Sequence, residues 1–317
     1  MMLKDKNVLV TGAGGMIGHC IVKRALSEGA FVRATKYTRD IKITHKNLQV
    51  VPCELFNMNE CEAVVKDIDV VFNSAAFVAG AGKQKEDPIS LVRNNLIPSI
   101  NISDAAVRNK IKVFVSIGSS TMYPDVNYPV KEDEAFSGEP FKGYEGVGWV
   151  KRFCEKAFTY YNNVTSTKFA FVRTTAVYGP HDNFDTDKLH VIPATIMKAV
   201  AKEDPFVVWG DGTAIRDFVY VEDFVDGIME VINREIWNDP INIATGTETT
   251  IKQMVETVID LCGYYPQIVY DSTKPTAIPY RMVDINKAKR MIDWSPKTNL
   301  VNGLYKTINW YKNEKHI

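Results

Sequence analysis

The chain has 317 residues, of which 45% are hydrophobic and 24% charged, and its 38 Lys and Arg residues balance its 38 Asp and Glu residues. Zero net charge argues against non-specific binding to nucleic acid, which needs an excess of cations against the phosphates. The longest stretch without Asp, Glu, Lys or Arg, residues 7–22, is too short to span a bilayer, and five Cys without a CxxC pair suit neither a disulfide framework nor a zinc site. We therefore expect a cytoplasmic protein with no metal, no membrane partner and no nucleic acid partner.

Apolar runs alternate with helical patterns through the first half of the chain. We expect buried strands at 6–11, 30–35, 48–51, 69–74, 112–117, 168–173 and 239–244. We expect helices from the first Gly-rich turn to about residue 28, at 88–109 and at 147–161. Strands separated by helices predict right-handed βαβ units and an α/β fold with a doubly wound parallel sheet of the Rossmann type.

Beyond Tyr178 this alternation loosens and Gly and Pro become frequent. No linker separates the two parts of the chain, so we expect two interleaved lobes. The division predicted is a dinucleotide-binding domain of residues 1–178 plus about 217–246, and a smaller C-terminal substrate lobe of about 179–216 plus 247–317.

The segment Thr11-Gly-Ala-Gly-Gly-Met-Ile-Gly18 lies between the first expected strand and the first expected helix. Gly12, Gly15 and Gly18 permit a tight turn, close approach of the backbone to a pyrophosphate, and close packing of helix on strand. The helix that starts at Met16 and Ile17 would present free N–H groups and its positive dipole end to the phosphates. A structural Gly-rich turn is the alternative, but the strand–turn–helix context favours a dinucleotide site.

The GxxGxxG spacing of this loop resembles the extended short-chain dehydrogenase/reductase family. The segments that extend the resemblance along the chain are Asn73-Ser-Ala-Ala76, Ser119-Ser-Thr-Met-Tyr-Pro124, Val177-Tyr-Gly-Pro180, Gly210-Asp-Gly-Thr-Ala-Ile-Arg-Asp-Phe218, Val221-Glu-Asp223 and Trp294-Ser-Pro296. Family members act on nucleotide-sugars bound between a Rossmann domain and a small C-terminal lobe. The resemblance therefore implies an oxidoreductase that uses NAD(H) or NADP(H).

The end of the second strand indicates which cofactor is used. An acidic residue there would bind the ribose 2′-hydroxyl of NAD, but this position is Lys36, with Arg39 nearby. Cations favour the 2′-phosphate of NADP(H) through charge-assisted hydrogen bonds, whereas solvated surface charges would leave NAD(H) open. The resemblance also assigns residues to the adenine and nicotinamide parts of the cofactor site, namely Glu54, Leu55, Ala75, Ala76 and Asn95.

The resemblance implies hydride chemistry assisted by a Tyr and a Lys at i and i+4 on one helix, in which the Lys holds the nicotinamide ribose and the Tyr moves the proton. Here Lys151 stands four residues after Val147, and Tyr144 is followed at i+4 by Gly148. The interval from Lys151 to Tyr178 equals that in the GDP-L-fucose synthase group, which places Lys151 in the lysine position and Val147 in the tyrosine position. Residues four positions apart lie on the same helix face and about 6 Å apart along the helix axis. Residues seven positions apart are about 10 Å apart along it.

Three interpretations of this missing Tyr remain. A substitute carries the proton, the enzyme is slow, or the protein binds its ligand without catalysis. The candidate substitutes are Tyr144, Thr121, His190 and a water held by Lys151. The resemblance also assigns the hydroxyls of Ser119 and Thr121 to the reacting sugar hydroxyl, although both residues also suit a plain turn after a strand.

Residue types weaken two other activities known in the family. The 4,6-dehydratases carry Thr-Asp-Glu where this chain has Ser119-Ser-Thr121. The 3,5-epimerase step pairs a Cys base with a His acid; His190 matches the acid, but Thr121 stands at the Cys position.

The segments Gly179-Pro-His-Asp-Asn-Phe184 and His190-Val-Ile-Pro-Ala194 resemble the GDP-sugar members of the family. The residues that this likeness assigns to the substrate are Asn183, His190, Val191, Lys198, Trp209, Arg216 and Arg281. An Arg suits a diphosphate because its planar fork donates paired hydrogen bonds; core packing would explain Trp209 alone, and a surface ion pair Arg216 alone. Arg173-Thr-Thr-Ala176 departs from the family pattern, since a substrate-facing Asn is missing.

We therefore predict a homodimer or higher homo-oligomer that oxidises or reduces C4 of a GDP-linked mannose- or heptose-type sugar, as in capsule sugar biosynthesis. The alternatives are a 4-epimerase that retains its cofactor and a catalytically silent GDP-sugar-binding protein.

Overall fold

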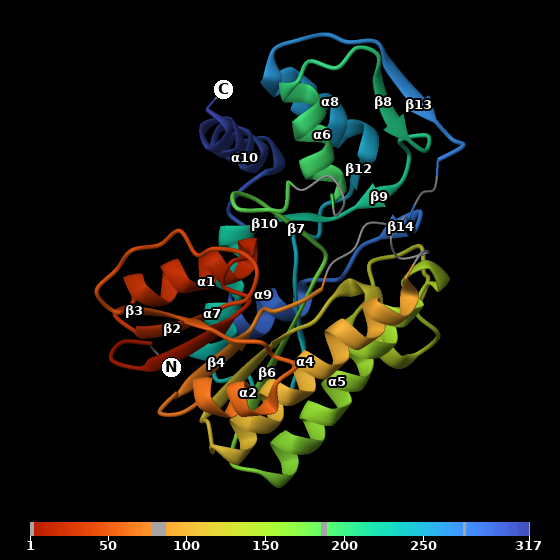
Figure 1. The fold of residues 1–317 in the computed structure, drawn as a ribbon. Coiled ribbons are helices and arrows are strands. Elements are labelled where there is room, and N and C mark those ends of the chain that lie inside the picture. The colour runs from red at the N-terminus through yellow and green to blue at the C-terminus, as the bar shows by residue number, and fades with distance from the viewer. Residues whose placement is uncertain (1–2, 78–86, 185–188, 275–276, 317) are drawn as a thin grey trace.

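The computed structural model describes residues 3–77, 87–184, 189–274 and 277–316. A larger lobe is built on a parallel sheet, and a smaller lobe lies above its edge in the view of Figure 1. Among the described residues, no helix combines the length and apolar character needed to cross a membrane.

The sheet of the larger lobe has seven strands in the order β11-β6-β5-β4-β1-β2-β3, and every neighbouring pair is parallel. The strands are β1 (Asn7–Thr11), β2 (Phe31–Lys36), β3 (Leu48–Pro52), β4 (Val70–Asn73), β5 (Val113–Ile117), β6 (Lys168–Thr174) and β11 (Ile241–Ile243). The strand order reverses between β1 and β4, which opens a crevice at the carboxyl ends of the strands. The predicted doubly wound Rossmann sheet is confirmed.

Helices cover both faces of this sheet (Figure 1). One face packs against α1 (Met16–Ser27), α7 (Val221–Asn233) and α9 (Asn286–Ile292), and the other against α2 (Met58–Val64), α4 (Pro88–Arg108) and α5 (Glu145–Val164). The alternation along β1 explains the two layers, because Val8 and Val10 join the first core and Leu9 joins the second.

The smaller lobe contains three helices around a core of its own. They are α6 (Val191–Val200), α8 (Ile251–Cys262) and α10 (Leu300–Lys315). Three small sheets complete the lobe and its junction: β8 (Phe206–Trp209) with β13 (Ile268–Asp271), β9 (Ile215–Arg216) with β12 (Thr249–Thr250) and β14 (Tyr280–Arg281), and β7 (Ala176–Tyr178) with β10 (Phe218–Tyr220). The division into two interleaved domains stays a prediction. Helix α9 falls in the part of the chain predicted for the smaller lobe, and its Ala288 and Ile292 pack in the core of the larger lobe.

The expected strands and helices of the larger lobe are present with ends shifted by one to three residues. Helix α5 starts at Glu145, two residues before the predicted start, and the Tyr144 side chain at its N-cap makes no capping hydrogen bond. The sequence analysis gave no bounds for α2, α7 and α9 of the larger lobe, for the elements of the smaller lobe, or for the short 3₁₀ turns η1 (Ser120–Met122), η2 (Glu132–Phe136) and η3 (Lys142–Tyr144). These turns have too few residues to show a hydrophobic period.

Candidate active site

Two glycines of the first turn, Gly12 and Gly18, occupy positions where no side chain fits. Gly12 has φ +64°, and a Cβ on it would lie 2.7 Å from the Cα of Ala75. A Cβ on Gly18 would lie 2.4 Å from the carbonyl oxygen of Gly12. Helix α1 begins after Gly15 without a side-chain cap in the described chain. The N–H groups of its first turn, at Met16, Ile17 and Gly18, thus remain available to an anion.

The segment after β4 lies beside this loop and is tied to both β1 and α4. Thr11 Oγ1 donates to Asn73 Oδ1 at 2.8 Å, and the N–H of Ala75 donates to Thr11 Oγ1 at 3.3 Å. The Asn95 side chain brackets the Phe77 backbone, accepting from its N–H at 3.0 Å and donating to its carbonyl at 2.9 Å. Ala75 and the exposed Ala76 are therefore held at the carboxyl edge of the sheet, and Asn95 supports the segment after β4.

An acidic residue, Asp40, follows β2 and pairs with the cation at the end of that strand. Lys36 Nζ lies 2.5 Å from Asp40 Oδ1, so the cation at this position is partnered. Arg39 packs against the phosphate loop, because a Cβ on Gly14 would lie 2.9 Å from its Cβ. After β3, the Glu54 N–H donates to Glu60 Oε2 at 2.7 Å and the Leu55 carbonyl accepts from Asn101 Nδ2 at 3.0 Å, which fixes the backbone of this expected adenine contact.

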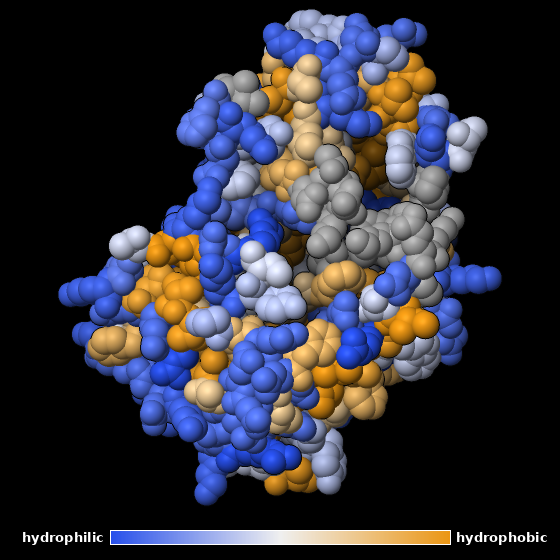
Figure 2. Space-filling model, viewed as in Figure 1, coloured by the Kyte–Doolittle hydropathy of each residue, from blue (hydrophilic) through white to orange (hydrophobic). Residues whose placement is uncertain are grey.

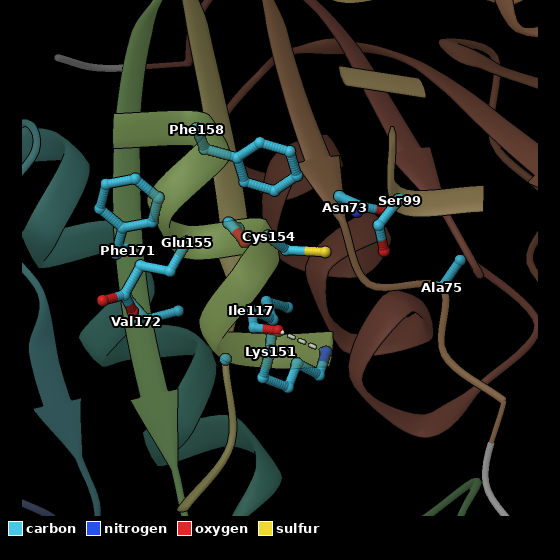
Figure 3. Close-up of a pocket in the computed structure, with 12 residues that line it drawn as sticks. Asn73, Ala75, Ser99, Ile117, Lys151, Cys154, Glu155, Phe158, Phe171 and Val172 are labelled. Carbon is cyan, nitrogen blue, oxygen red and sulfur yellow. Dashed lines mark hydrogen bonds between the residues drawn. The ribbon is translucent and has the colours of Figure 1, made fainter. Parts of the chain in front are cut away.

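Lys151 lies one turn after Val147 on α5 and points to the carboxyl end of β5. Its Nζ donates to the Ile117 carbonyl at 3.0 Å (Figure 3). Burial lowers the pKa of this ammonium, which the nearby Cys154 partly counters. Beside it is a cavity of about 10 Å³, roughly the space of a single water. The lining of this cavity includes Asn73, Ser99, Ser116, Cys154 and Glu155.

The turn η1 carries the two predicted hydroxyl residues. Ser119 Oγ accepts from the Thr121 N–H at 3.2 Å, so this hydroxyl caps the turn. Thr121 Oγ1 is buried and has no hydrogen-bond partner in the described residues. A buried hydroxyl without a partner is costly, so Thr121 is suited to receive a ligand atom. Helix α5 approaches η1 closely at Gly148, where a Cβ would lie 2.7 Å from the Thr121 carbonyl oxygen.

A buried polar network, which the sequence analysis missed, holds α5 and η1 in place. The Arg173 guanidinium on β6 donates two hydrogen bonds to the Glu155 carboxylate on α5, at 2.9 and 2.5 Å, and a third to Tyr123 Oη at 2.8 Å. Tyr123 in turn donates to Asn242 Oδ1 on β11 at 2.6 Å. Arg152 donates to the Met122 carbonyl at 2.7 Å. In the sequence, Arg173 interrupts the apolar pattern of a buried strand. Beyond that, the sequence carries no signal of these contacts.

Two arginines of the smaller lobe meet across β9 and β14. Arg216 and Arg281 are register partners on these parallel strands. Arg281 is 4% exposed and donates from Nη1 to the Pro124 carbonyl at 3.0 Å, while its Nε and Nη2 are buried without a partner in the described residues. Burial lowers the pKa of both guanidinium groups, and the nearby Tyr144 partly offsets this shift. A buried cation with unmet donors beside a second cation makes a site for an anion.

The other predicted substrate residues lie on α6, on β8 and in the segment before α6. Exposed His190 is the N-cap of α6, and Val191 is the first residue of that helix. Lys198 Nζ donates to the Val207 carbonyl at 2.8 Å, so its ammonium is engaged within the smaller lobe. Trp209 ends β8 with 54% of its surface exposed. The Asn183 N–H donates to Asp182 Oδ1 at 2.7 Å.

The structure therefore brings the predicted residues together in groups. Ser119, Thr121 and Lys151 gather on η1 and α5, while Tyr144 stands at the start of α5 near Arg216 and Arg281. In Figure 2 the surface is hollowed between the two lobes. The described residues hold no cluster of three or more His, Cys, Asp or Glu that could bind a metal.

A Gly-built anion loop at the switch point of a Rossmann sheet, with a lysine at the same edge, defines a nicotinamide-dependent oxidoreductase fold. The chain belongs to the NAD dependent epimerase/dehydratase family, whose model matches residues 8–244. It is thus an enzyme of the extended short-chain dehydrogenase/reductase type.

Known proteins resemble the chain along nearly its whole length. It is 30% identical to GDP-L-colitose synthase of Yersinia pseudotuberculosis, over 98% of this chain and 99% of that protein. It is 29% identical to GDP-L-fucose synthase of Escherichia coli strain K12, over 98% and 97%. Among solved structures, UDP-N-acetylglucosamine 4-epimerase of Methanobrevibacter ruminantium superposes with a TM-score of 0.87 at 28% identity, over 98% and 99% of the two chains.

Proposed function

We propose that this protein is an NAD(P)-dependent oxidoreductase that acts at C4 of a GDP-linked sugar of the mannose or heptose type. The observation that carries the proposal is the pair Arg216 and Arg281, since Arg281 keeps two buried guanidinium nitrogens without a partner in the described chain. A nucleoside diphosphate would supply the missing acceptors. The two curated relatives described above are named as synthases of GDP-sugars, which favours guanosine over other nucleosides.

The cofactor would bind across the carboxyl ends of β1 and β4. The residues fit it, because the turn at Gly12 and Gly18 has no room for a Cβ and the first N–H groups of α1 lack a side-chain cap. Ala75, Ala76 and Lys151 would face its nicotinamide half, and Glu54 and Leu55 its adenine. When bound, the cofactor supplies or accepts a hydride.

The sugar would lie between η1 and the smaller lobe. Thr121 Oγ1, buried without a partner in the described residues, would bond the C4 oxygen together with Ser119. Trp209, exposed at the end of β8, would lie against the guanine base, and the start of α6 at His190 and Val191 would border the nucleotide. Asn183 and Lys198 lie in the same part of the smaller lobe.

The proposal is tested by incubating the purified protein with GDP-mannose and a GDP-heptose, with NAD or NADP, while recording the absorbance of reduced nicotinamide. UDP-mannose is the control substrate, because it keeps the diphosphate and the sugar and changes only the base. Net cofactor reduction supports the dehydrogenase. A C4-inverted product without net reduction would identify the 4-epimerase, and tight binding of the GDP-sugar without turnover would identify the silent binding protein.

We also propose that two copies associate through α4 and α5, which pack side by side in Figure 1. One stripe of α5 leaves Trp149, Phe153 and Tyr160 exposed, the last two by 56% and 63% of their surface. Apolar stripes of this kind mark association surfaces. Phe153→Glu should shift the sedimentation coefficient to that of a monomer, whereas Tyr265→Glu, at an exposed residue of the smaller lobe, should not.

A further inference from the structure

The position one turn before Lys151 cannot transfer a proton. Val147 is an aliphatic, half-buried residue on the helix face that leads to Lys151. The nearest phenol on this helix, Tyr144, lies at the N-cap, close enough to Arg216 and Arg281 to raise the pKa of both guanidinium groups against the effect of burial. Tyr144 thus stands at the end of the helix nearer the arginine pair, and seven residues separate it from Lys151 (about 10 Å along a helix).

Lys151 is a buried amine that the described chain leaves without a counter-ion. Its Nζ donates to a backbone carbonyl, that of Ile117. Neutral groups of β4, β5 and α4 line the cavity beside it, and α5 adds the thiol of Cys154 and the carboxylate of Glu155. Glu155 is committed to Arg173 through two hydrogen bonds. Figure 3 shows the Lys151 ammonium beside the Ile117 carbonyl, with Glu155 directed elsewhere.

The helix that carries Lys151 is rigidly docked. The close approach at Gly148, the Arg152 bond to the Met122 carbonyl and the Glu155–Arg173 pair all fall within four residues of it. A group fixed in this way can hold a reacting atom within the narrow tolerance that proton transfer needs.

We propose that Lys151 itself exchanges the proton with the C4 oxygen of the sugar, in the place that a tyrosine would take. In the reducing direction the C4 carbonyl carbon gains a hydride from the reduced nicotinamide, and the carbonyl π pair moves to oxygen. That oxygen takes a proton from the Lys151 ammonium, so an N–H bond breaks and an O–H bond forms; water restores the proton to the amine. In the oxidising direction the neutral amine takes the hydroxyl proton. Burial favours the neutral amine and lowers the pKa of Lys151.

This inference rests on the proposed function, and amine rescue tests it separately. Lys151→Ala should lower turnover by roughly 10²–10⁴-fold, the usual contribution of a positioned acid or base. Added methylamine, ethylamine and fluoroethylamine should restore part of the rate, to an extent that follows the basicity of the amine. Lys156→Ala, at an exposed lysine of the same helix, should keep the parental rate and show no rescue. Calorimetry should show that Lys151→Ala still binds the cofactor and the GDP-sugar, and that any loss of cofactor affinity is much smaller than the loss of turnover.

A second readout does not need turnover. In ¹⁵Nζ-lysine NMR of the protein alone, the resonance that Lys151→Ala removes should titrate below the ordinary lysine value of about 10.4. Rescue that is independent of amine basicity, or a Lys151 resonance that titrates at or above the ordinary value, would overturn the inference. Val147→Tyr gives a further check: with a phenol restored, the loss caused by Lys151→Ala should become smaller. A wild-type protein inactive on every GDP-sugar would instead refute the proposed function.

Discussion

Arg281 on β14 lies directly opposite Arg216 on β9, as a register partner on a parallel strand pair. Like charges in this position repel each other, and Arg281 is buried with two nitrogens unpaired in the described residues. The free protein therefore bears a cost that a bound dianion would offset. A local loss of stability in the free protein is characteristic of binding sites.

Arg281→Met should separate stability from binding. Without ligand the melting temperature should stay unchanged or rise, because the variant removes a buried, half-paired cation while keeping most of the side-chain volume. The stabilisation by GDP or GDP-mannose should be lost, since each charged hydrogen bond contributes about 1.5–3 kcal/mol. Thermal shift with and without GDP measures both effects. Arg290→Met, at an exposed residue of α9, is the control and should retain the ligand shift; the same shift in Arg281→Met would contradict the assignment.

The ion pair of Lys36 and Asp40 should govern the choice between NAD and NADP. Asp40 carries the carboxylate that neutralises Lys36, so Asp40→Asn should free a cation and strengthen binding of the 2′-phosphate of NADP(H), by about tenfold or less at an exposed site. Lys36→Ala should weaken NADP(H) and leave NAD(H) nearly unchanged. Calorimetric titration with both cofactors checks this, with the exposed Asp260→Asn on α8 as control. If NADP affinity is the same in Asp40→Asn and wild type, the pair is a surface contact only.

The contrast between these sites shows what sequence reasoning can reach. The strand–Gly turn–helix unit at Thr11 to Gly18 is local, so its period and glycines specify it directly. The partnership of Arg216 with Arg281 depends on two-residue strands 65 positions apart, and the Glu155–Arg173 bond depends on how α5 packs on β6. Short strands have no readable period, and an ion pair across packed elements leaves no local pattern. The Lys36–Asp40 pair, by contrast, joins residues four positions apart, so the sequence does carry a signal of it.

Gly148 should be required for the docking of α5 on η1. An added Cβ would lie 2.7 Å from both the Thr121 carbonyl oxygen and the Pro140 Cβ, so Gly148→Ala should push α5 away from η1. The overpacking should cost about 1–3 kcal/mol, more than the helix propensity of about 1 kcal/mol gained from Ala. Turnover should fall by more than the loss of folded protein explains, because Thr121 and Lys151 separate.

Urea unfolding and single-turnover rates measure the two effects of Gly148→Ala. Gly138→Ala is a matched control, since its Cβ would meet Pro124 at 3.4 Å, an ordinary contact. Parental stability in Gly148→Ala would show that η1 can yield, and would count against a rigid α5–η1 contact.

Lys151 should make the stability of the protein depend on pH in a defined direction. Burial lowers the pKa of Lys151 in the folded state, whereas the unfolded chain keeps the ordinary value of about 10.4. Between these two pKa values the unfolded state binds more protons than the folded state, so the free energy of unfolding rises with pH across that window. Below the folded pKa both states are protonated, and the buried charge remains as a constant cost.

The Lys151→Met variant lacks this contribution, so its stability advantage over wild type should be largest at low pH and shrink as pH approaches 10. Urea unfolding at a series of pH values measures the difference between the two proteins, which cancels the titration of all other groups. A difference that is constant across the series would mean that Lys151 stays charged in the folded protein, and a difference that grows with pH would mean that an unseen partner stabilises the ammonium.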